Sequence, residues 1–158
     1  PSSCRQYPWC FMGTLWPGTT RQQAVACFQQ QIPHGFVHGS EGFGKGLAHD
    51  HYAYQLHQSS FSLCPEGDRH FETFRFYESL ELGAIPLSLV APAEFTALFG
   101  EPWPLPHFSC WEKAAEFARV LLMDAKAMDS LQLRLRCWWE QERFRAASRL
   151  HNSFTKRA

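Results

Sequence analysis

The sequence has no hydrophobic run long enough to cross a membrane. Its apolar stretches, such as Val120 to Met123, are far shorter than the roughly 20 residues that a membrane-spanning helix needs. It also has no net charge, with 15 basic and 15 acidic residues. Hydrophobic residues make up 45% of the 158 residues, which excludes intrinsic disorder and is enough for the core of one ordinary domain.

No C-x-x-C pair occurs among the six cysteines, which argues against a zinc ribbon or finger. An even number of cysteines permits three disulfides in an oxidising compartment, in any of 15 pairings. Buried free thiols are the alternative, because a free cysteine packs as a small hydrophobic residue. The sequence leaves both states open for Cys4, Cys10, Cys27, Cys64, Cys110 and Cys137.

Several catalytic signatures are missing as well. The chain has no G-x-S-x-G of serine hydrolases and no G-x-G-x-x-G after its first predicted strand. It also lacks the D-x-D that holds a divalent ion in many sugar transferases, and the H-E-x-x-H of zinc proteases. Five histidines gather between His34 and His57, but not at the spacing of metal ligands, so we expect loop histidines and no metal or other cofactor.

What is present is an alternation of short apolar strands with helical patterns. Strands are predicted at 10–15, 35–38, 61–64 and 84–90, and helices at 21–31, 50–59, 71–82 and from 110 onward. A proline-rich connection is expected at 91–108, and Gly83 is expected to end the helix before it. This order predicts the α/β class, a Rossmann-like parallel sheet with flanking helices over 1–124 and a helical extension over 125–158.

Ligands of such sheets bind beyond the carboxyl ends of the strands, which directs attention to residues 13–21, 39–46 and 65–75. The second stretch contains Gly39-x-x-x-x-Gly44-Lys45, most of a phosphate-binding P-loop. Gly46 stands where a P-loop needs Ser or Thr for magnesium. A glycine-rich surface loop near a ligand is therefore favoured, and a phosphotransferase that uses Lys45 remains the alternative.

The charge is unevenly distributed along the chain. Seven basic residues and two acidic ones lie from Leu131 onward, so the first 130 residues carry the compensating negative charge. A basic tail is most often a solvated helix face, and we expect no nucleic-acid partner. A non-catalytic module that binds carbohydrate or RNA through this tail remains a second alternative.

The segment from Ser62 to Leu87 holds the most informative pattern. A strand leads into a Pro-Glu-Gly turn and then into a helix that carries Arg75 and Glu78. These two residues are three apart and share one helix face. They are either a surface ion pair or a ligand-binding pair, in which Arg75 meets a phosphate and Glu78 accepts hydrogen bonds from ribose hydroxyls.

The same segment resembles the exostosin-type glycosyltransferases and is close in motif to ribitol xylosyltransferases. The resemblance is carried by the central run of about 25 residues and more weakly by Phe11-Met12-Gly13 with Arg21, and by Leu105-Pro106 with Trp111. Ser79 stands where these families usually have Ala. The matching central positions are Phe61, Leu63, Pro65, Gly67, Phe74-Arg75-Phe76, Glu78, Leu80, Gly83, Ile85 and Pro86.

The resemblance implies the C-terminal, donor-binding half of a two-domain GT-B glycosyltransferase. Such an enzyme transfers a sugar with inversion from a nucleotide sugar, usually a UDP-sugar, to a glycan acceptor. By the same resemblance, Arg75 neutralises the leaving diphosphate, Glu78 holds the ribose, and the remaining donor-site residues are Gly13, Arg21, Pro65, Glu66 and Gly67.

The chain begins with Pro1 rather than Met, so we expect a piece of a longer protein. The resemblance implies that the rest includes an acceptor domain and a type II membrane anchor, with a Golgi-lumen location. A cytoplasmic location is the alternative.

Overall fold

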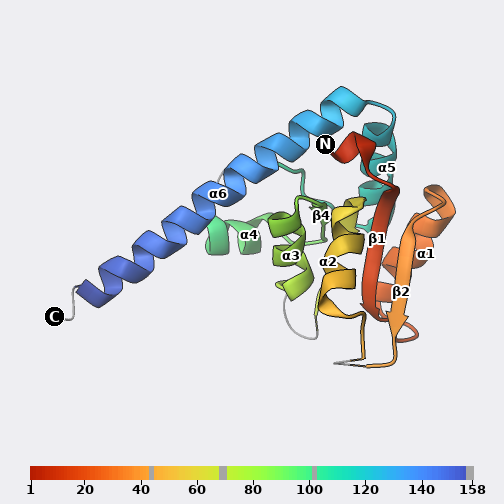
Figure 1. Cartoon of the computed structure of the whole chain (residues 1–158), viewed down its shortest axis with the longest axis horizontal. Coiled ribbons are helices and arrows are strands. Elements are labelled where there is room, and N and C mark those ends of the chain that lie inside the picture. The colour runs from red at the N-terminus through yellow and green to blue at the C-terminus, as the bar shows by residue number, and fades with distance from the viewer. Residues whose placement is uncertain (43–44, 68–70, 101–102, 156–158) are drawn as a thin grey trace.

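The computed structural model describes residues 1–42, 45–67, 71–100 and 103–155 and contains an α/β body with one long helix across it (Figure 1). In chain order the elements are η1 (Ser2–Cys4), β1 (Tyr7–Thr14), α1 (Thr20–Gln31), β2 (Phe36–Ser40), α2 (His49–His57), β3 (Ser59–Leu63), α3 (Phe74–Leu82), β4 (Ile85–Leu87), α4 (Pro92–Phe99), α5 (Trp111–Leu122) and α6 (Ala125–Thr155).

The strands form one parallel sheet in the order β2-β1-β3-β4, which confirms the predicted fold class. Cys10 of β1 lies opposite both Phe36 of β2 and Ser62 of β3, so β1 is an inner strand. Pro86 lies on the edge strand β4, where its missing N–H removes no hydrogen bond from the sheet interior. From β1 the chain continues to β2 on one side of β1. It then returns to β3 on the other side of β1 and continues outward to β4.

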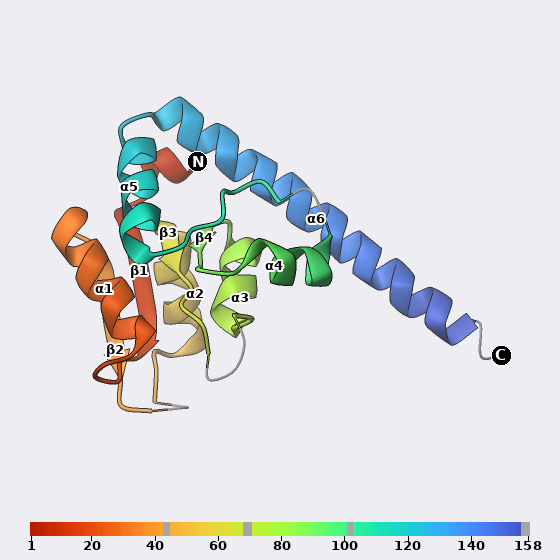
Figure 2. The same ribbon diagram turned by 180° about the vertical axis from the view of Figure 1, so that it is seen from behind.

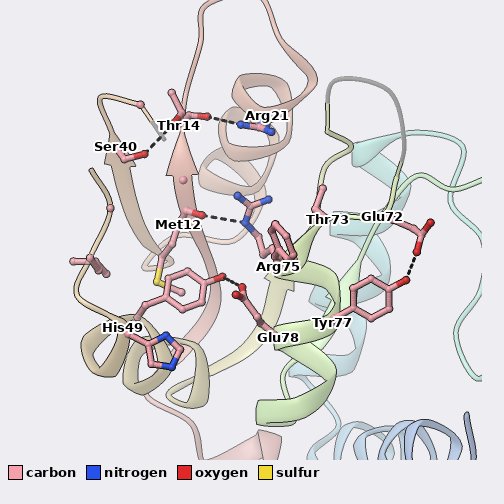
Figure 3. Close-up of a pocket in the computed structure, with 16 residues that line it drawn as sticks. Met12, Thr14, Arg21, Ser40, His49, Glu72, Thr73, Arg75, Tyr77 and Glu78 are labelled. Carbon is pink, nitrogen blue, oxygen red and sulfur yellow. Dashed lines mark hydrogen bonds between the residues drawn. The ribbon is translucent and has the colours of Figure 1, made fainter. Parts of the chain in front are cut away.

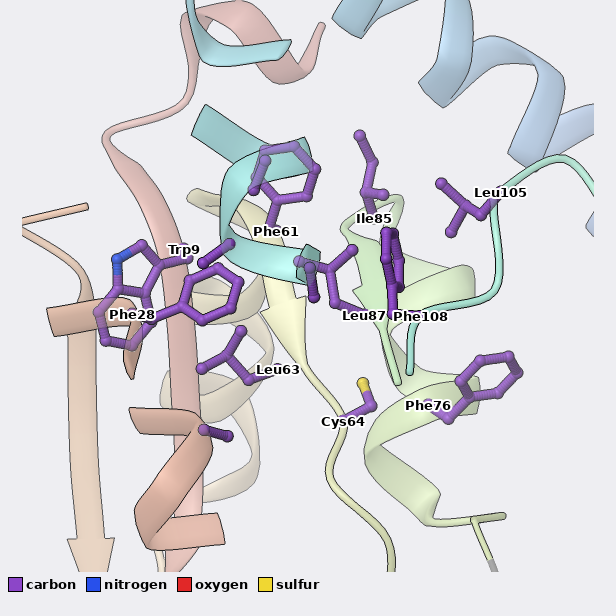
Figure 4. Close-up of a cluster of buried hydrophobic side chains, with 14 of the residues drawn as sticks. Trp9, Phe28, Phe61, Leu63, Cys64, Phe76, Ile85, Leu87, Leu105 and Phe108 are labelled. Carbon is purple, nitrogen blue, oxygen red and sulfur yellow. The ribbon is translucent and has the colours of Figure 1, made fainter. Parts of the chain in front are cut away.

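Side chains alternate along β1 between two buried layers. Trp9 and Phe11 belong to the main core, to which α1 contributes Phe28 and α5 contributes Trp111. Figure 4 shows Trp9 beside Phe28 in this core. Cys10 and Met12 point to the opposite face, where they pack with Leu56 of α2. Because both faces are covered, β1 is apolar on both sides, as is typical of parallel sheets, whereas β3 buries the serines Ser60 and Ser62.

Helix α4 is the main difference from the sequence prediction, which placed a connection without regular structure at 91–108. Pro92 lies in the first turn, where a proline costs no hydrogen bond because that N–H has no helical partner. Phe95 on this helix is 1% exposed, and its ring lies 4.5 Å from that of Trp103 and 6.4 Å from that of Phe76. The helix therefore forms where the Phe95 ring is buried among aromatic residues from other parts of the chain.

Helix α3 begins at Phe74, three residues later than predicted, because Phe71 is used elsewhere. The Phe71 ring is buried edge-on against Phe76, with ring centroids 6.0 Å apart. Thr73 is extended and becomes the residue before the helix. At the other end Gly83 adopts a left-handed conformation (φ 72°) and ends the helix, as predicted.

Helix α6 packs on the body through its first half and projects beyond it in both views (Figures 1 and 2). Its inward side chains join the main core; these are Met128, Leu131, Leu135 and Trp138. Farther along the helix Phe144 is 74% exposed. Within the part of the chain that the structure describes, no helix combines the length and the apolar character that crossing a bilayer requires.

Candidate nucleotide-sugar site

A cleft of about 810 Å³ lies at the carboxyl ends of β1 and β2, between these ends and helices α2 and α3 (Figure 3). β1 and β3 are the two strands at which the chain order reverses, the place where open α/β sheets bind ligands. The volume lies within the range of small-molecule sites. The lining residues are Met12, Gly13, Thr14, Arg21, Ser40, Gly42, Gly46, Leu47, His49, Tyr52, Glu72, Thr73, Phe74, Arg75, Tyr77 and Glu78.

Arg75 comes from the first turn of α3 and is fixed against the end of β1. Its Nε donates a hydrogen bond to the carbonyl oxygen of Met12 at 3.0 Å, and its guanidinium lies 4.7 Å from the ring centroid of Phe11. Its Nη1 is buried without a hydrogen-bond partner. A buried donor without an acceptor is costly, so the guanidinium is ready to receive an anion.

Gly13 makes this approach of the guanidinium possible. A Cβ built on Gly13 would lie 2.4 Å from Nη2 of Arg75, and the residue has φ +150°. Both the space and the backbone conformation therefore favour glycine at this position. The glycine and the arginine that the sequence analysis placed in one site are thus in direct contact.

Arg21 brings a second guanidinium to the cleft from the first turns of α1. Its Nη1 donates to the carbonyl oxygen of Thr14 at 3.4 Å, and its guanidinium lies 4.9 Å from the ring centroid of Trp16. Burial lowers the pKa of Arg21, and the positive charge of Arg75 lowers it further. An arginine stays charged despite such a shift, so two positive groups face one cleft and repel each other, which makes the cleft favourable for an anion.

Glu78 lies one helical turn beyond Arg75 and faces the same cleft. Its Oε2 accepts a hydrogen bond of 2.7 Å from the hydroxyl of Tyr52 on α2. Burial and the neighbouring carboxylate raise the pKa of Tyr52, so its hydroxyl keeps the proton that it donates. The hydrogen bonds among the described residues leave Oε1 of Glu78 unengaged.

Arg75 and Glu78 do not form the surface ion pair that the sequence left open. Within the described residues, the ion pairs join Arg143 to Glu81 and Arg145 to Glu142. Arg75 instead binds a backbone carbonyl and Glu78 a tyrosine hydroxyl. Each of them keeps hydrogen-bonding capacity for a ligand in the cleft.

Four of the seven predicted site residues line the cleft: Gly13, Arg21, Arg75 and Glu78. The other three do not. Pro65 is buried, Glu66 is exposed and Gly67 is half-buried, and all three lie outside the cleft lining. Strand β3 ends at Leu63, and Pro65 to Gly67 follow it directly. The cleft is lined instead by Glu72 to Arg75, which lie where the connection from β3 reaches α3.

The glycine-rich stretch also reaches the cleft, through Ser40, Gly42 and Gly46. Lys45, the residue on which the phosphotransferase alternative depends, is exposed and is not part of the lining. Helix α2 begins only at His49, whereas a P-loop lysine opens its helix. Gly44 lies outside the described residues.

Tyr52, Thr73 and the Thr14–Ser40 pair are site features that the sequence analysis missed. The hydroxyls of Thr14 and Ser40 lie 3.0 Å apart across the ends of β1 and β2. Oγ1 of Thr73 is buried without a partner beside Arg75. Their positions in the sequence could have indicated them, because all of these residues except Tyr52 lie in the three stretches that follow predicted strands, 13–21, 39–46 and 65–75. Tyr52 lies within a helix, where a tyrosine is ordinarily read as packing.

The described residues contain no group of three His, Cys, Asp or Glu side chains arranged to hold a metal ion. All six cysteines are free thiols, and of these Cys10 and Cys64 are buried. Burial raises the pKa of Cys10 to about 12, so this thiol stays protonated. The positive charge in the cleft comes from arginines.

The part of the chain that carries the cleft matches a known protein family. The model of the RXYLT1 C-terminal domain matches residues 1–92, more than half of the chain and the whole of the cleft lining. No curated protein matches the chain. The family match confirms the predicted closeness to ribitol xylosyltransferases, whereas the exostosin-type features stay a prediction. With a glycosyltransferase-related domain over its α/β body, the chain belongs to the RXYLT1 C-terminal domain family.

Proposed function

We propose that this chain is the donor-binding domain of an inverting glycosyltransferase that transfers a sugar from a UDP-sugar to a glycan acceptor. The observation that carries the proposal is the unpartnered Nη1 of Arg75, buried in a cleft that a second guanidinium, Arg21, also lines. The diphosphate of a nucleotide sugar supplies the missing acceptors. The family match supports the glycosyltransferase part of the proposal.

The proposed orientation of the donor follows from helix α3. A rise of about 1.5 Å per residue separates Arg75 and Glu78 by about 4.5 Å along the helix axis. We therefore assign the diphosphate to Arg75 and Arg21 and the ribose hydroxyls to Glu78. The first helical turn of α3 also faces the cleft, and its free N–H groups favour negative charge.

Arg75 is the proposed catalytic residue, because it contacts the leaving group. As the glycosidic bond to the diphosphate breaks, negative charge grows on the leaving oxygen, and a fixed guanidinium stabilises that charge without reorganising. Inversion requires the acceptor hydroxyl to attack from the opposite side of the sugar. We assign the base for that hydroxyl to an acceptor domain elsewhere in the full protein. We also propose that the full protein has a membrane anchor and that its two domains lie in the Golgi lumen.

Calorimetry of the purified chain tests this proposal. UDP is expected to bind more tightly than uridine, because only UDP carries the diphosphate that Arg75 and Arg21 are proposed to bind. The affinity for UDP is expected to survive EDTA, since arginines supply the positive charge. The chain alone is expected not to transfer sugar, and rapid transfer to an added acceptor would contradict the division of roles between two domains.

Two other binding experiments separate the alternatives. Tight binding of ATP with magnesium that is lost on Lys45→Ala would favour the phosphotransferase. Binding of heparin or RNA that weakens steeply with salt, without any binding of UDP, would favour a polyanion-binding module.

A further inference from the structure

A tyrosine on α2 is hydrogen-bonded to Glu78, the carboxylate that we assign to the ribose. Tyr52 donates to Oε2 of Glu78 at 2.7 Å, and this bond joins α2 to α3 across the cleft, which both residues line. The two helices follow different strands, β2 and β3. The hydrogen bond is therefore a tertiary contact, made at the place where a ligand would enter.

The geometry leaves Glu78 prepared for a ligand with two hydroxyl groups. The Tyr52 bond uses one lone pair of Oε2, and an ionised carboxylate has about four acceptor sites on its two oxygens. Oε1 and the remaining lone pair of Oε2 stay available. A free glutamate side chain samples several rotamers, and the tyrosine bond removes part of that freedom before binding.

The tyrosine itself is firmly placed. Its ring packs against a small cluster on the second face of the sheet, formed by Cys10, Met12, Leu56 and Ala84. Two residues along the same helix, Tyr54 is 55% exposed and lies outside the cleft lining. One helix thus offers both the residue of interest and a matched control.

We propose that Tyr52 is a positioning residue that orients Glu78 and so makes the site selective for a ribonucleotide over a 2′-deoxyribonucleotide. This inference rests on the proposed function, because it assumes that Glu78 meets the ribose. Tyr52 acts through Glu78 and does not contact the reacting atoms. The Tyr52→Phe variant removes only the hydroxyl and keeps the packed ring, so the fold is expected to persist.

The test is calorimetry with UDP and 2′-deoxy-UDP on the wild-type chain, Tyr52→Phe and Tyr54→Phe. The wild type is expected to prefer UDP. In Tyr52→Phe this preference is expected to shrink by about three- to tenfold, the range of one hydrogen bond. The affinity for 2′-deoxy-UDP, which keeps only the 3′-hydroxyl, is expected to fall less than the affinity for UDP, and Tyr54→Phe to behave as wild type.

A double-mutant cycle adds a second readout. Once Glu78→Gln is present, Tyr52→Phe is expected to change the nucleotide preference little further, because both changes break the same interaction. An equal loss of both nucleotides in Tyr52→Phe would show a merely structural role and overturn the inference. An unchanged preference in Tyr52→Phe, beside a wild type that prefers UDP, would overturn this inference alone. A wild type that binds neither nucleotide would overturn the proposed function with it.

Discussion

The segment up to Glu78 and the segment after Pro92 perform different tasks in one domain. Among the residues that the structure describes, the cleft lining lies between Met12 and Glu78, within the part that the family model matches. The described residues after Pro92 contribute nothing to this lining. It contributes an aromatic cluster of Phe95, Phe99, Trp103 and Trp138 and the long helix α6. Ligand chemistry is thus concentrated in the first segment, and the second supports it.

The two segments meet on α3, where Arg75 faces the cleft and the next residue, Phe76, faces the core. Phe76 is fully buried, with its ring 6.2 Å from Phe99 and 5.9 Å from Trp103 of the second segment. Arg75, one residue earlier, faces the cleft. Packing of the second segment on one side of α3 therefore holds the cleft-lining side in place. Changes in the two segments are expected to separate stability from binding.

The largest effect is expected from Trp138→Ala in the second segment. The Trp138 ring is 5% exposed and lies 4.7 Å from Trp103 and 6.0 Å from Phe95. Truncation of a buried aromatic residue costs about 3–5 kcal/mol of the free energy of unfolding. Urea denaturation measures the loss. Binding of UDP by the folded fraction is expected to stay near wild type.

Trp138→Phe provides a milder version that keeps much of the ring volume. It is expected to lose less stability than Trp138→Ala while the affinity for UDP stays unchanged. A loss of affinity without a loss of stability in either variant would contradict the supporting role of the second segment.

Arg75→Lys is expected to have the largest effect on binding. The lysine keeps the charge but cannot reproduce the forked donor, and a hydrogen bond to a charged group contributes about 1.5–3 kcal/mol. We expect a loss near the upper end of this range for UDP and little loss for uridine, measured by calorimetry. Similar losses for the two ligands would show that Arg75 does not meet the diphosphate.

Glu78→Gln is expected to weaken both UDP and uridine, because both carry the ribose. Glutamine keeps the volume and one acceptor oxygen, so we expect a loss near the lower end of the same range, about 1.5 kcal/mol. Comparing the two ligands with the two variants gives four affinities. Wild-type binding in both variants, with the fold intact, would refute the assigned site.

The smallest effect is expected at the ion pair between α6 and α3. Arg143 of α6 lies 3.1 Å from Glu81 of α3, and their side chains are 58% and 46% exposed. Exposed ion pairs contribute about 0.2–1 kcal/mol, so Arg143→Ala is expected to lower the free energy of unfolding by less than about 0.5 kcal/mol. A loss as large as that of Trp138→Phe would mean that the exposed pair, and not the aromatic cluster, holds α6 to the body.

The amino-acid sequence by itself determined the α/β class, the helix-ending Gly83 and the placement of Arg75 and Glu78 on one face of α3. Each of these depends on residues close together in the chain, and local spacing is enough to predict them. The resemblance added Gly13 and Arg21. The sequence also indicated the correct edge of the sheet, since parallel strands present their carboxyl ends together.

Only the tertiary structure decided which groups each site residue contacts. Arg75 binds Met12 from 63 positions away, and Tyr52 binds Glu78 from 26. Helix α4 exists where Phe95 finds a buried aromatic environment. Residues 65–67 lie outside the cleft lining, whereas Glu72 to Arg75 belong to it. Contacts of this kind leave no local pattern, because packing between distant segments and not residue spacing selects them.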